Sequence, residues 1–244
     1  MGLVIIVLIL IIVACAFFTF MARVAIRPKV HTLEYEMDNL LSLEHMKDES
    51  IAIENEHYVT SYDGYKLWTG FVPGDAENRH YVILSHGYTS TRYGMYKYVA
   101  LWRRMGYNCV IYDNRGHGVN PATDCSFGIW ESRDLMAVIE DTYQRYGADI
   151  HVGLHGESMG AGLQVMALAH KPKVDFIVND CGYSEILPVL KWKVQDSFHF
   201  ASVLAELASP FAKIFHGYRF EDVRPIDNLK ENEATKTERI KKTF

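Results

Sequence analysis

The N-terminus of the chain carries an uninterrupted apolar run. From Leu3 to Phe20 no residue is charged, and most are Ile, Leu, Val or Phe. At about 1.5 Å per residue, a helix of roughly 18 to 20 residues spans the hydrocarbon core of a bilayer, about 30 Å thick. A buried core helix is the weaker interpretation, because the run is apolar on all sides and lies at the terminus. We therefore predict a single transmembrane helix over residues 1–22.

Two other interpretations of this N-terminus stay open. Ala14-Cys15-Ala16 is compatible with a signal-peptidase site, and Ile12-Val13-Ala14-Cys15 resembles a bacterial lipoprotein box. Both fit less well, since no Lys or Arg precedes the apolar run and the run continues beyond both sites. The nearest positive charges, Arg23, Arg27 and Lys29, all follow it. The positive-inside rule then favours a single-pass membrane protein whose catalytic domain is cytoplasmic.

Residues 23–53 form a linker or amphipathic segment between this helix and the rest of the chain. From His31 onward the segment is polar and acidic, with apolar residues at loosely helical spacing: Leu33, Met37, Leu40, Leu41 and Leu43. This pattern fits an amphipathic helix lying on the following domain, and it fits a stalk equally well. The sequence does not choose between the two.

From residue 54 onward, short apolar runs alternate with amphipathic ones. Asp63-Gly64 separates two β-rich runs and predicts a hairpin, because glycine adopts the positive φ of a tight turn. Later apolar runs predict strands over Tyr81–Ser85, Asn108–Tyr112, Asp149–Leu154 and Val174–Val178. Helices are predicted between them, over Met95–Arg104, Ser132–Tyr146 and Ala161–His170. This alternation predicts an α/β fold over residues 54–229, with a mainly parallel sheet covered by helices on both faces.

Two patterns follow near the C-terminal end. Residues 184–220 form a long helical stretch rich in large apolar side chains, including Trp192, Phe198, Phe200 and Phe211. Residues 230–244 are almost wholly polar, so we expect a polar tail there and no buried strand.

Composition narrows the class of protein. With 244 residues, 49% of them hydrophobic, the chain can bury one sizeable core. The net charge of -5 and scattered Lys and Arg give no basic stripe, so nucleic acid is not an expected partner. Cys15, Cys109, Cys125 and Cys181 form no convincing disulfide framework and are expected to be packing residues. The histidines lack H-E-x-x-H or C-x-x-C companions, so we expect no metal and no cofactor.

The candidate chemistry begins with the segment Gly156-Glu157-Ser158-Met159-Gly160, which fits the pattern G-x-S-x-G. A predicted strand runs into it and a predicted helix runs out, which is the setting in which this pattern presents a nucleophile. Small residues here, with Gly162 after them, let a strained turn fit beneath the helix. The hydroxyl of Ser158 would then be exposed at the apex of the turn.

Two further motifs precede this one, each at the end of a predicted strand. The first is His86-Gly87-Tyr88, and the second, from Asp113 to Gly118, reads D-x-R-G-x-G. With the G-x-S-x-G segment, in this order, they resemble an α/β-hydrolase from about Glu54 to Leu229. The chain is most similar to bacterial membrane-anchored hydrolases of the serine aminopeptidase and esterase branches. These often carry a segment like Asp180-Cys181-Gly182-Tyr183 after the serine.

The resemblance implies a serine hydrolase that cleaves ester, thioester or amide bonds through an acyl-enzyme. Ser158 would be the nucleophile, and the backbone N–H groups of Met159 and Tyr88 would form the oxyanion hole. The substrate would be a small molecule carrying an acyl group, or a peptide. In hydrolases of this fold, an insertion in the place of residues 184–220 commonly caps the pocket, although an ordinary core helix would show the same apolar stripe.

The acid and the histidine of a triad are the parts that the sequence does not supply. In this fold they follow the serine, and only His170, His199 and His216 do so here. None falls where the base of the family lies, so each is expected to be a surface or packing residue. Asp180 is an alternative acid, but it has no histidine to orient. We infer that the chain ends early and lacks both groups, and we expect weak or absent activity.

Two rival hypotheses follow from that expectation. In the first rival hypothesis, the chain is a non-catalytic, membrane-anchored binding or scaffold protein that retains the hydrolase sheet and pocket. The other rival is a truncated product without a stable fold, because loss of the last strands exposes an edge of the sheet.

Overall fold

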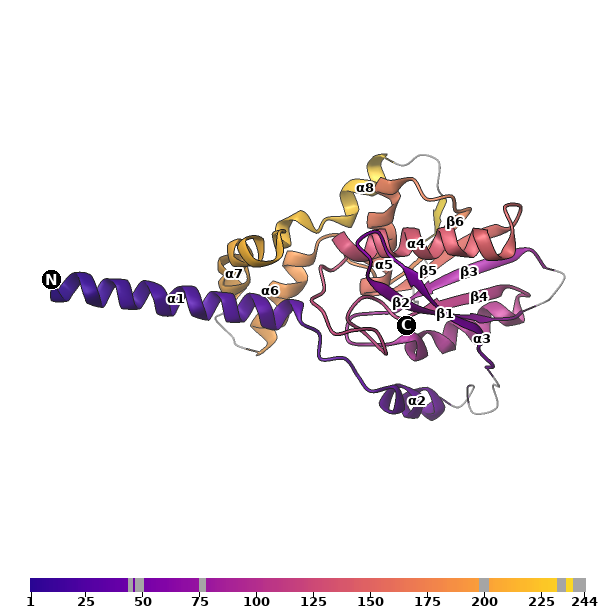
Figure 1. Ribbon diagram of the computed structural model, residues 1–244, viewed down its shortest axis with the longest axis horizontal. Coiled ribbons are helices and arrows are strands. Elements are labelled where there is room, and N and C mark those ends of the chain that lie inside the picture. The colour runs from indigo at the N-terminus through magenta and orange to yellow at the C-terminus, as the bar shows by residue number, and fades with distance from the viewer. Residues whose placement is uncertain (44–45, 47–50, 75–77, 198–201, 232–235, 239–244) are drawn as a thin grey trace. The chain divides into compact units, whose positions relative to one another are not determined.

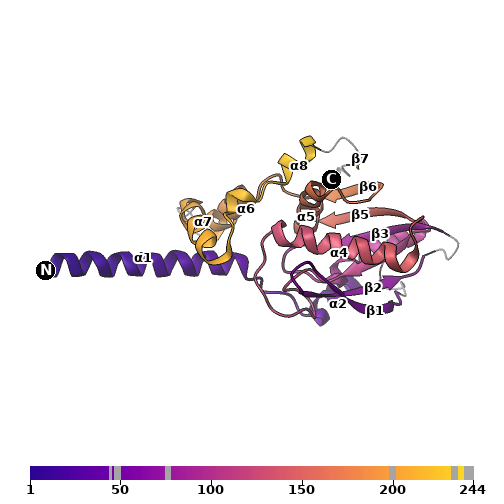
Figure 2. The same ribbon diagram turned by 45° about the horizontal axis from the view of Figure 1, so that its top comes forward.

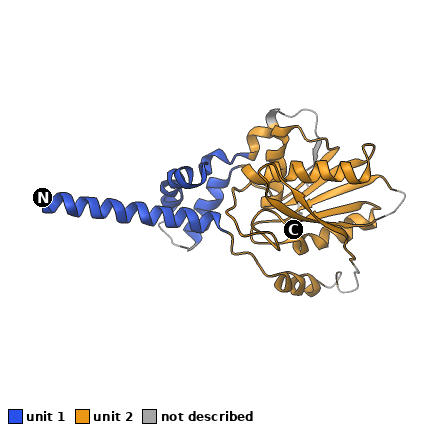
Figure 3. Cartoon of the chain, in the orientation of Figure 1, with its two compact units in different colours: residues 1–27, 185–224 blue, residues 28–184, 225–244 orange. Residues whose placement is uncertain are grey.

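The computed structural model divides the chain into two compact units (Figure 3). Unit 1 comprises residues 1–27 and 185–224, and unit 2 comprises residues 28–184 and 225–244. The structure describes residues 1–43, 46, 51–74, 78–197, 202–231 and 236–238.

Unit 2 is built on a seven-stranded sheet in the order β1-β2-β4-β3-β5-β6-β7 (Figure 1). The strands are β1 Glu54–Thr60, β2 Lys66–Val72, β3 His80–Ser85, β4 Asn108–Tyr112, β5 His151–Glu157, β6 Phe176–Asp180 and β7 Lys236–Glu238. The pairs β1–β2 and β2–β4 are antiparallel, and the other neighbours pair in parallel. The predicted α/β fold with a mainly parallel sheet is confirmed.

The first antiparallel pair is the predicted hairpin. Gly64 has a φ of 85° at its turn, where a side chain would be strained. The Gly64 N–H donates to the Ser61 carbonyl at 3.0 Å, and the Ser61 N–H donates to the Tyr65 carbonyl at 2.8 Å. These bonds close the turn and bring Asp63 to its apex.

Apolar cores lie on both faces of the sheet, as the alternation of the sequence predicts. Helices α4 and α5 cover one face (Figure 2), where Leu135 and Leu163 are buried against Leu154 of β5. Helices α2 and α3 supply the other core, in which Leu40 and Trp102 are buried. The helices of unit 2 are α2 Leu33–Ser42, η2 Arg92–Met95, α3 Tyr96–Arg104, α4 Ile129–Tyr146, α5 Met159–Ala167, η3 Leu168–His170 and α8 Pro225–Glu231.

Residues 33–42 of the linker therefore form a helix that packs into unit 2 through Leu40. The Thr32 hydroxyl caps this helix by accepting the Tyr35 N–H at 3.1 Å. The structure thus has the amphipathic helix for this part of the linker and not the stalk.

Two boundaries differ from those that the sequence indicates. Strand β5 continues past Leu154 to Glu157, because Gly156 and Glu157 stay paired with Asn179 and Asp180 of β6. The segment in which we expect no buried strand contributes β7, which pairs in parallel with β6. Backbone groups form these pairs, so polar side chains do not prevent them.

Unit 1 is helical. It consists of α1 Gly2–Ile26, α6 Ile186–Ser197, α7 Ser202–His216 and η4 Phe220–Asp222. The C-terminal part of α1 packs on α7, with Ala22 and Ile26 buried and the rings of Phe18 and Phe211 stacked at 5.7 Å. Residues 2–17 of α1 are exposed. The predicted long apolar helix is present, and its length and composition are sufficient to cross a membrane.

Candidate active site

Ser158 occupies a strained turn between β5 and α5. Its φ of 53° and ψ of -111° lie in a region that residues with side chains rarely adopt. The Ser158 N–H donates to the Asp180 carbonyl at 2.8 Å, and the Ser158 carbonyl accepts the Gly162 N–H at 3.0 Å. Both neighbours thus hold the backbone of the turn, while the serine itself is exposed. This is the geometry of a nucleophile elbow.

The glycines on either side make this turn possible. A Cβ added to Gly156 would overlap the backbone of Gly160, and a Cβ added to Gly160 would overlap the Ser85 carbonyl oxygen. The helix that follows Ser158 therefore packs directly on β5 and on the end of β3. The pattern G-x-S-x-G is required here because the backbones approach too closely for any side chain.

The loop after β3 lies beside the serine. A Cβ added to Gly87 would come within 3.4 Å of the Ser158 Cβ. Gly87, Tyr88 and Ser158 line one cavity of about 280 Å³. Met159 is the first residue of α5, with its side chain buried and its Sδ 3.3 Å from the Cys125 Sγ. The structure thus brings together the three residues that the sequence predicts for the site.

Two buried histidines hold that loop in place. The His86 Nδ1–H donates to the Gly87 carbonyl at 2.8 Å, and its Nε2 accepts the Asn114 N–H at 2.9 Å. The His117 Nε2 accepts the Thr89 N–H at 3.3 Å, and its Nδ1–H donates to the Arg115 carbonyl at 2.8 Å.

Burial lowers the pKa of both imidazoles to about 4. Both rings are therefore neutral near pH 7, and each ring nitrogen is engaged by the backbone. Neither histidine has a nitrogen available to take a proton from a serine.

The motif after β4 begins with a buried ion pair. Asp113 accepts from the Arg92 guanidinium, and it also accepts the backbone N–H groups of Arg92 at 2.9 Å and Val119 at 3.2 Å. The Arg92 guanidinium lies 3.9 Å from the ring centre of Trp68. Burial raises the pKa of the Asp113 carboxyl, and the Arg92 charge opposes that rise. The pair joins the end of β4 to η2.

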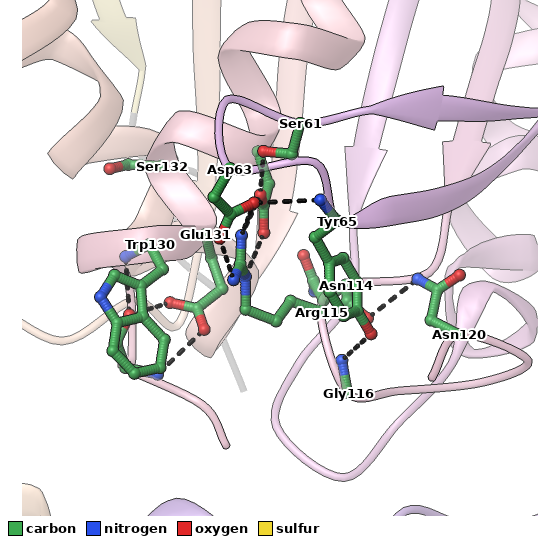
Figure 4. Close-up of polar contacts among 12 residues, drawn as sticks. Ser61, Asp63, Tyr65, Asn114, Arg115, Gly116, Asn120, Trp130, Glu131 and Ser132 are labelled. Atoms are coloured by element: carbon green, nitrogen blue, oxygen red, sulfur yellow. Dashed lines mark hydrogen bonds and ion pairs between the residues drawn. The ribbon is translucent and has the colours of Figure 1, made fainter. Parts of the chain in front are cut away.

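Arg115 of the same motif ties three elements together (Figure 4). Its guanidinium donates to Asp134 of α4 at 2.7 and 2.9 Å and to Asp63 of the hairpin at 2.8 Å. It also lies 4.8 Å from the ring centre of Tyr65. None of these side chains lines the cavity at Ser158. The arginine of the motif therefore stabilises the fold around the site.

Helix α2 and the residues just before it contribute side chains to the cavity that the sequence does not indicate. His31, Glu36 and Asn39 line it, together with Ser90, Gly94, Lys97 and Glu157. The Lys97 Nζ lies 2.9 Å from Glu157 Oε1. Helical spacing predicts only that Leu40 faces a core. No local sequence pattern predicts that the polar side of α2 lies in the same cavity as Ser158.

Of the candidate triad partners in unit 2, neither the His170 ring nor the Asp180 carboxylate is hydrogen-bonded to the Ser158 hydroxyl. His170 is exposed, its Nε2 is 3.5 Å from the Ser132 Oγ, and burial of its ring lowers its pKa. His216 ends α7 in unit 1, and His199 lies outside the described residues. The Asp180 carboxylate accepts from the Tyr98 hydroxyl. Over the described part of the chain, the Ser158 hydroxyl has no hydrogen-bond partner.

His155 also lies close to the elbow, on β5. Its Nδ1 accepts the Trp102 indole N–H at 2.8 Å, which leaves the proton of the neutral ring on Nε2. Burial lowers the pKa of this imidazole to about 4. The ring is thus a neutral packing group between Trp102 and Tyr98, whose ring centre lies 4.3 Å away. Within the described residues, no three His, Cys, Asp or Glu side chains are grouped to hold a metal ion.

Comparison with known proteins places this geometry in a family. Residues 76–234 match the family model Hydrolase_4, described as serine aminopeptidase, S33. The Bacillus subtilis (strain 168) protein YqkD is 30% identical over 190 residues, which are 76% of this chain and 59% of YqkD. The chain therefore spans about 59% of the length of this curated relative.

Solved structures share the fold at low identity. A structure of the Pyrococcus furiosus esterase Pf2001 has a TM-score of 0.58 at 19% identity, covering 88% of this chain and 87% of that one. The Pyrococcus horikoshii acylaminoacyl peptidase has a TM-score of 0.53 at 16% identity, covering 82% of this chain and 33% of that one. The resemblance to an α/β-hydrolase is confirmed, and the chain belongs to the serine hydrolase family Hydrolase_4, serine aminopeptidase, S33.

Proposed function

We propose that the protein hydrolyses acyl substrates at Ser158. The observation that carries the proposal is the exposed serine at a strained turn, in the same cavity as Tyr88. The hydroxyl would attack an ester, thioester or amide carbonyl and release the alcohol, thiol or amine. Water would then hydrolyse the acyl-enzyme and free the serine.

The oxyanion of each tetrahedral intermediate needs hydrogen-bond donors fixed before the reaction. In our proposal the Met159 and Tyr88 backbone N–H groups are those donors, one from the start of α5 and one from the loop after β3. The two histidines that bind this loop would keep the second donor in position. Loss of one such donor costs about 3 to 4 kcal/mol of barrier.

The test is acyl hydrolysis by the full chain in detergent micelles. Short-chain p-nitrophenyl esters, an acyl thioester and an aminoacyl p-nitroanilide would sample the three bond types. We expect Ser158→Ala to lower the best of these activities by at least about tenfold, because the acyl-enzyme can no longer form. Ser184→Ala, an exposed serine elsewhere in unit 2, is the matched control and should keep full activity. Equal rates for Ser158→Ala and wild type would refute the assignment.

One observation favours a second candidate function, that of a non-catalytic binding protein. The Ser158 hydroxyl has no base within hydrogen-bond distance among the described residues, and an unassisted hydroxyl is a poor nucleophile. A binding protein would retain an acyl ligand equally in wild type and Ser158→Ala, with no turnover in either. Turnover that disappears in Ser158→Ala excludes it.

We also propose that α1 anchors the protein in a membrane as a single-pass helix, with unit 2 in the cytoplasm. The exposed apolar surface over residues 2–17 supports the anchor, and Arg23 and Arg27 after it support the orientation. Carbonate extraction at alkaline pH should leave the protein in the membrane pellet. A mature N-terminus at Cys15 or Phe17 would instead support cleavage of a signal sequence. Digestion of unit 2 by a protease added to intact cells would show that unit 2 lies outside the cytoplasm.

A further inference from the structure

The chain just before α2 contacts the loop that carries Tyr88. The His31 N–H donates to the Thr89 carbonyl at 2.8 Å. The Thr89 N–H donates in turn to His117, so this residue joins the loop both to its buried frame and to the linker. Leu40 then fixes the far end of α2 in the core of unit 2. Residues 31–40 are thereby held at both ends across one side of the cavity.

The polar side chains on this stretch face the same cavity as the nucleophile. The His31 Nδ1 lies 3.0 Å from Glu36 Oε1, and Glu36 is buried while His31 is exposed. Asn39, one turn after Glu36, lines the cavity as well. Its amide is exposed, offers donors and an acceptor, and has no hydrogen bond from its side chain to another described residue.

The charged side chains around the cavity each have a polar partner. The Glu36 carboxylate lies 3.0 Å from the His31 Nδ1, and Lys97 forms an ion pair with Glu157. A ligand that carries a formal charge would have to displace one of these partners. An uncharged group with hydroxyls would find both donors and acceptors without breaking either pair. The cavity therefore suits a neutral, hydrogen-bonding group better than a phosphate, which would meet two carboxylates, or a quaternary ammonium, which can form no hydrogen bond with Asn39 or His31.

We propose that α2 and the residues before it form one wall of the substrate site, where Asn39 and His31 bind an uncharged, hydroxyl-bearing leaving group. This proposal rests on acyl hydrolysis at Ser158. It gives the linker after the apolar helix a role in substrate selection. The side chains that would select the substrate are part of no catalytic motif.

The first test compares substrates that share an acyl group. Wild type should prefer glyceryl monobutyrate over ethyl butyrate and over butyrylcholine in kcat/KM. Asn39→Ala should lower the ratio of glyceryl to ethyl ester kcat/KM about tenfold, as expected for the loss of hydrogen bonds to the ligand. His31→Ala should also lower this ratio. The substitution removes only the side chain, so the backbone bond to Thr89 remains and the loop that carries Tyr88 keeps its support. The control is Asp38→Ala, which changes the neighbouring exposed residue that does not line the cavity.

The second test does not depend on turnover. The ether 1-O-butylglycerol, which cannot be hydrolysed, should bind Ser158→Ala, and adding Asn39→Ala should raise its Kd about tenfold. An unchanged Kd and an unchanged substrate ratio would overturn the proposal, as would a preference for butyrylcholine. If no ester is hydrolysed but the Kd still responds to Asn39→Ala, acyl hydrolysis fails and the binding wall stands.

Discussion

The two sides of the cavity at Ser158 are built differently. On one side is the loop after β3, which is held from behind by His86 and His117; both rings are buried and each ring nitrogen has a backbone partner. On the other side are α2 and the residues just before it, where Asn39 and His31 are exposed. Polar groups whose partners all lie within the protein fix a backbone, whereas exposed ones remain available to a ligand. The comparison indicates a structural role for His86 and His117, and it agrees with our proposal that His31 and Asn39 contact the substrate.

The largest effect should come from the buried ion pair of Arg115 and Asp134, which stabilises the fold behind the loop side. Asp134→Ala removes the carboxylate that accepts two hydrogen bonds from Arg115, and leaves that guanidinium with Asp63 alone. Breaking a buried pair in this way costs about 3 to 5 kcal/mol of the free energy of unfolding. Thermal unfolding in detergent would measure the loss. Glu140→Ala, an exposed position on the same helix, should change the Tm very little.

The next prediction compares the loss of stability caused by a substitution on each side of the cavity. His86→Ala removes the acceptor of the Asn114 N–H and the donor to the Gly87 carbonyl, both buried, and should cost about 2 to 3 kcal/mol. His31→Ala removes an exposed ring and its single hydrogen bond to Glu36, and should cost at most about 1 kcal/mol. Urea unfolding of both variants tests the contrast. Equal losses for the two histidines would remove the distinction on which the comparison rests.

The smallest effect is the pH dependence that His117 contributes to stability. The pKa of His117 is about 4 in the folded protein, against 6.5 for an ordinary histidine, so between these values the unfolded chain binds more protons. Stability from this group is complete above pH 6.5 and decreases toward pH 4, by at most about 1.4 kcal/mol per pH unit. The loss of unfolding free energy from pH 7 to pH 5 should therefore be smaller in His117→Gln than in wild type. The same loss in both would show that His117 does not titrate as described.

Most of the fold follows from local pattern. Apolar runs bounded by turn residues locate the central strands to within a few residues, and Asp63-Gly64 identifies the hairpin. Strand β7 has no apolar signal, because backbone pairing with β6 forms it. The site divides in the same way. The candidate residues Ser158, Met159 and Tyr88 are predicted from motifs that turns and close backbone approaches impose. His31, Glu36 and Asn39 are not found, because only the packing of α2 brings them to the cavity.

The measurement that tests the central claim most directly is the site of reaction with a fluorophosphonate probe. The native full chain in micelles would be labelled, digested and analysed by mass spectrometry. Nucleophilicity that depends on the elbow predicts a single modified peptide containing Ser158. Labelling should be lost in Ser158→Ala and in heat-unfolded protein, and retained in Ser184→Ala. A native protein that stays unlabelled, or that carries the probe on another residue, would contradict the account.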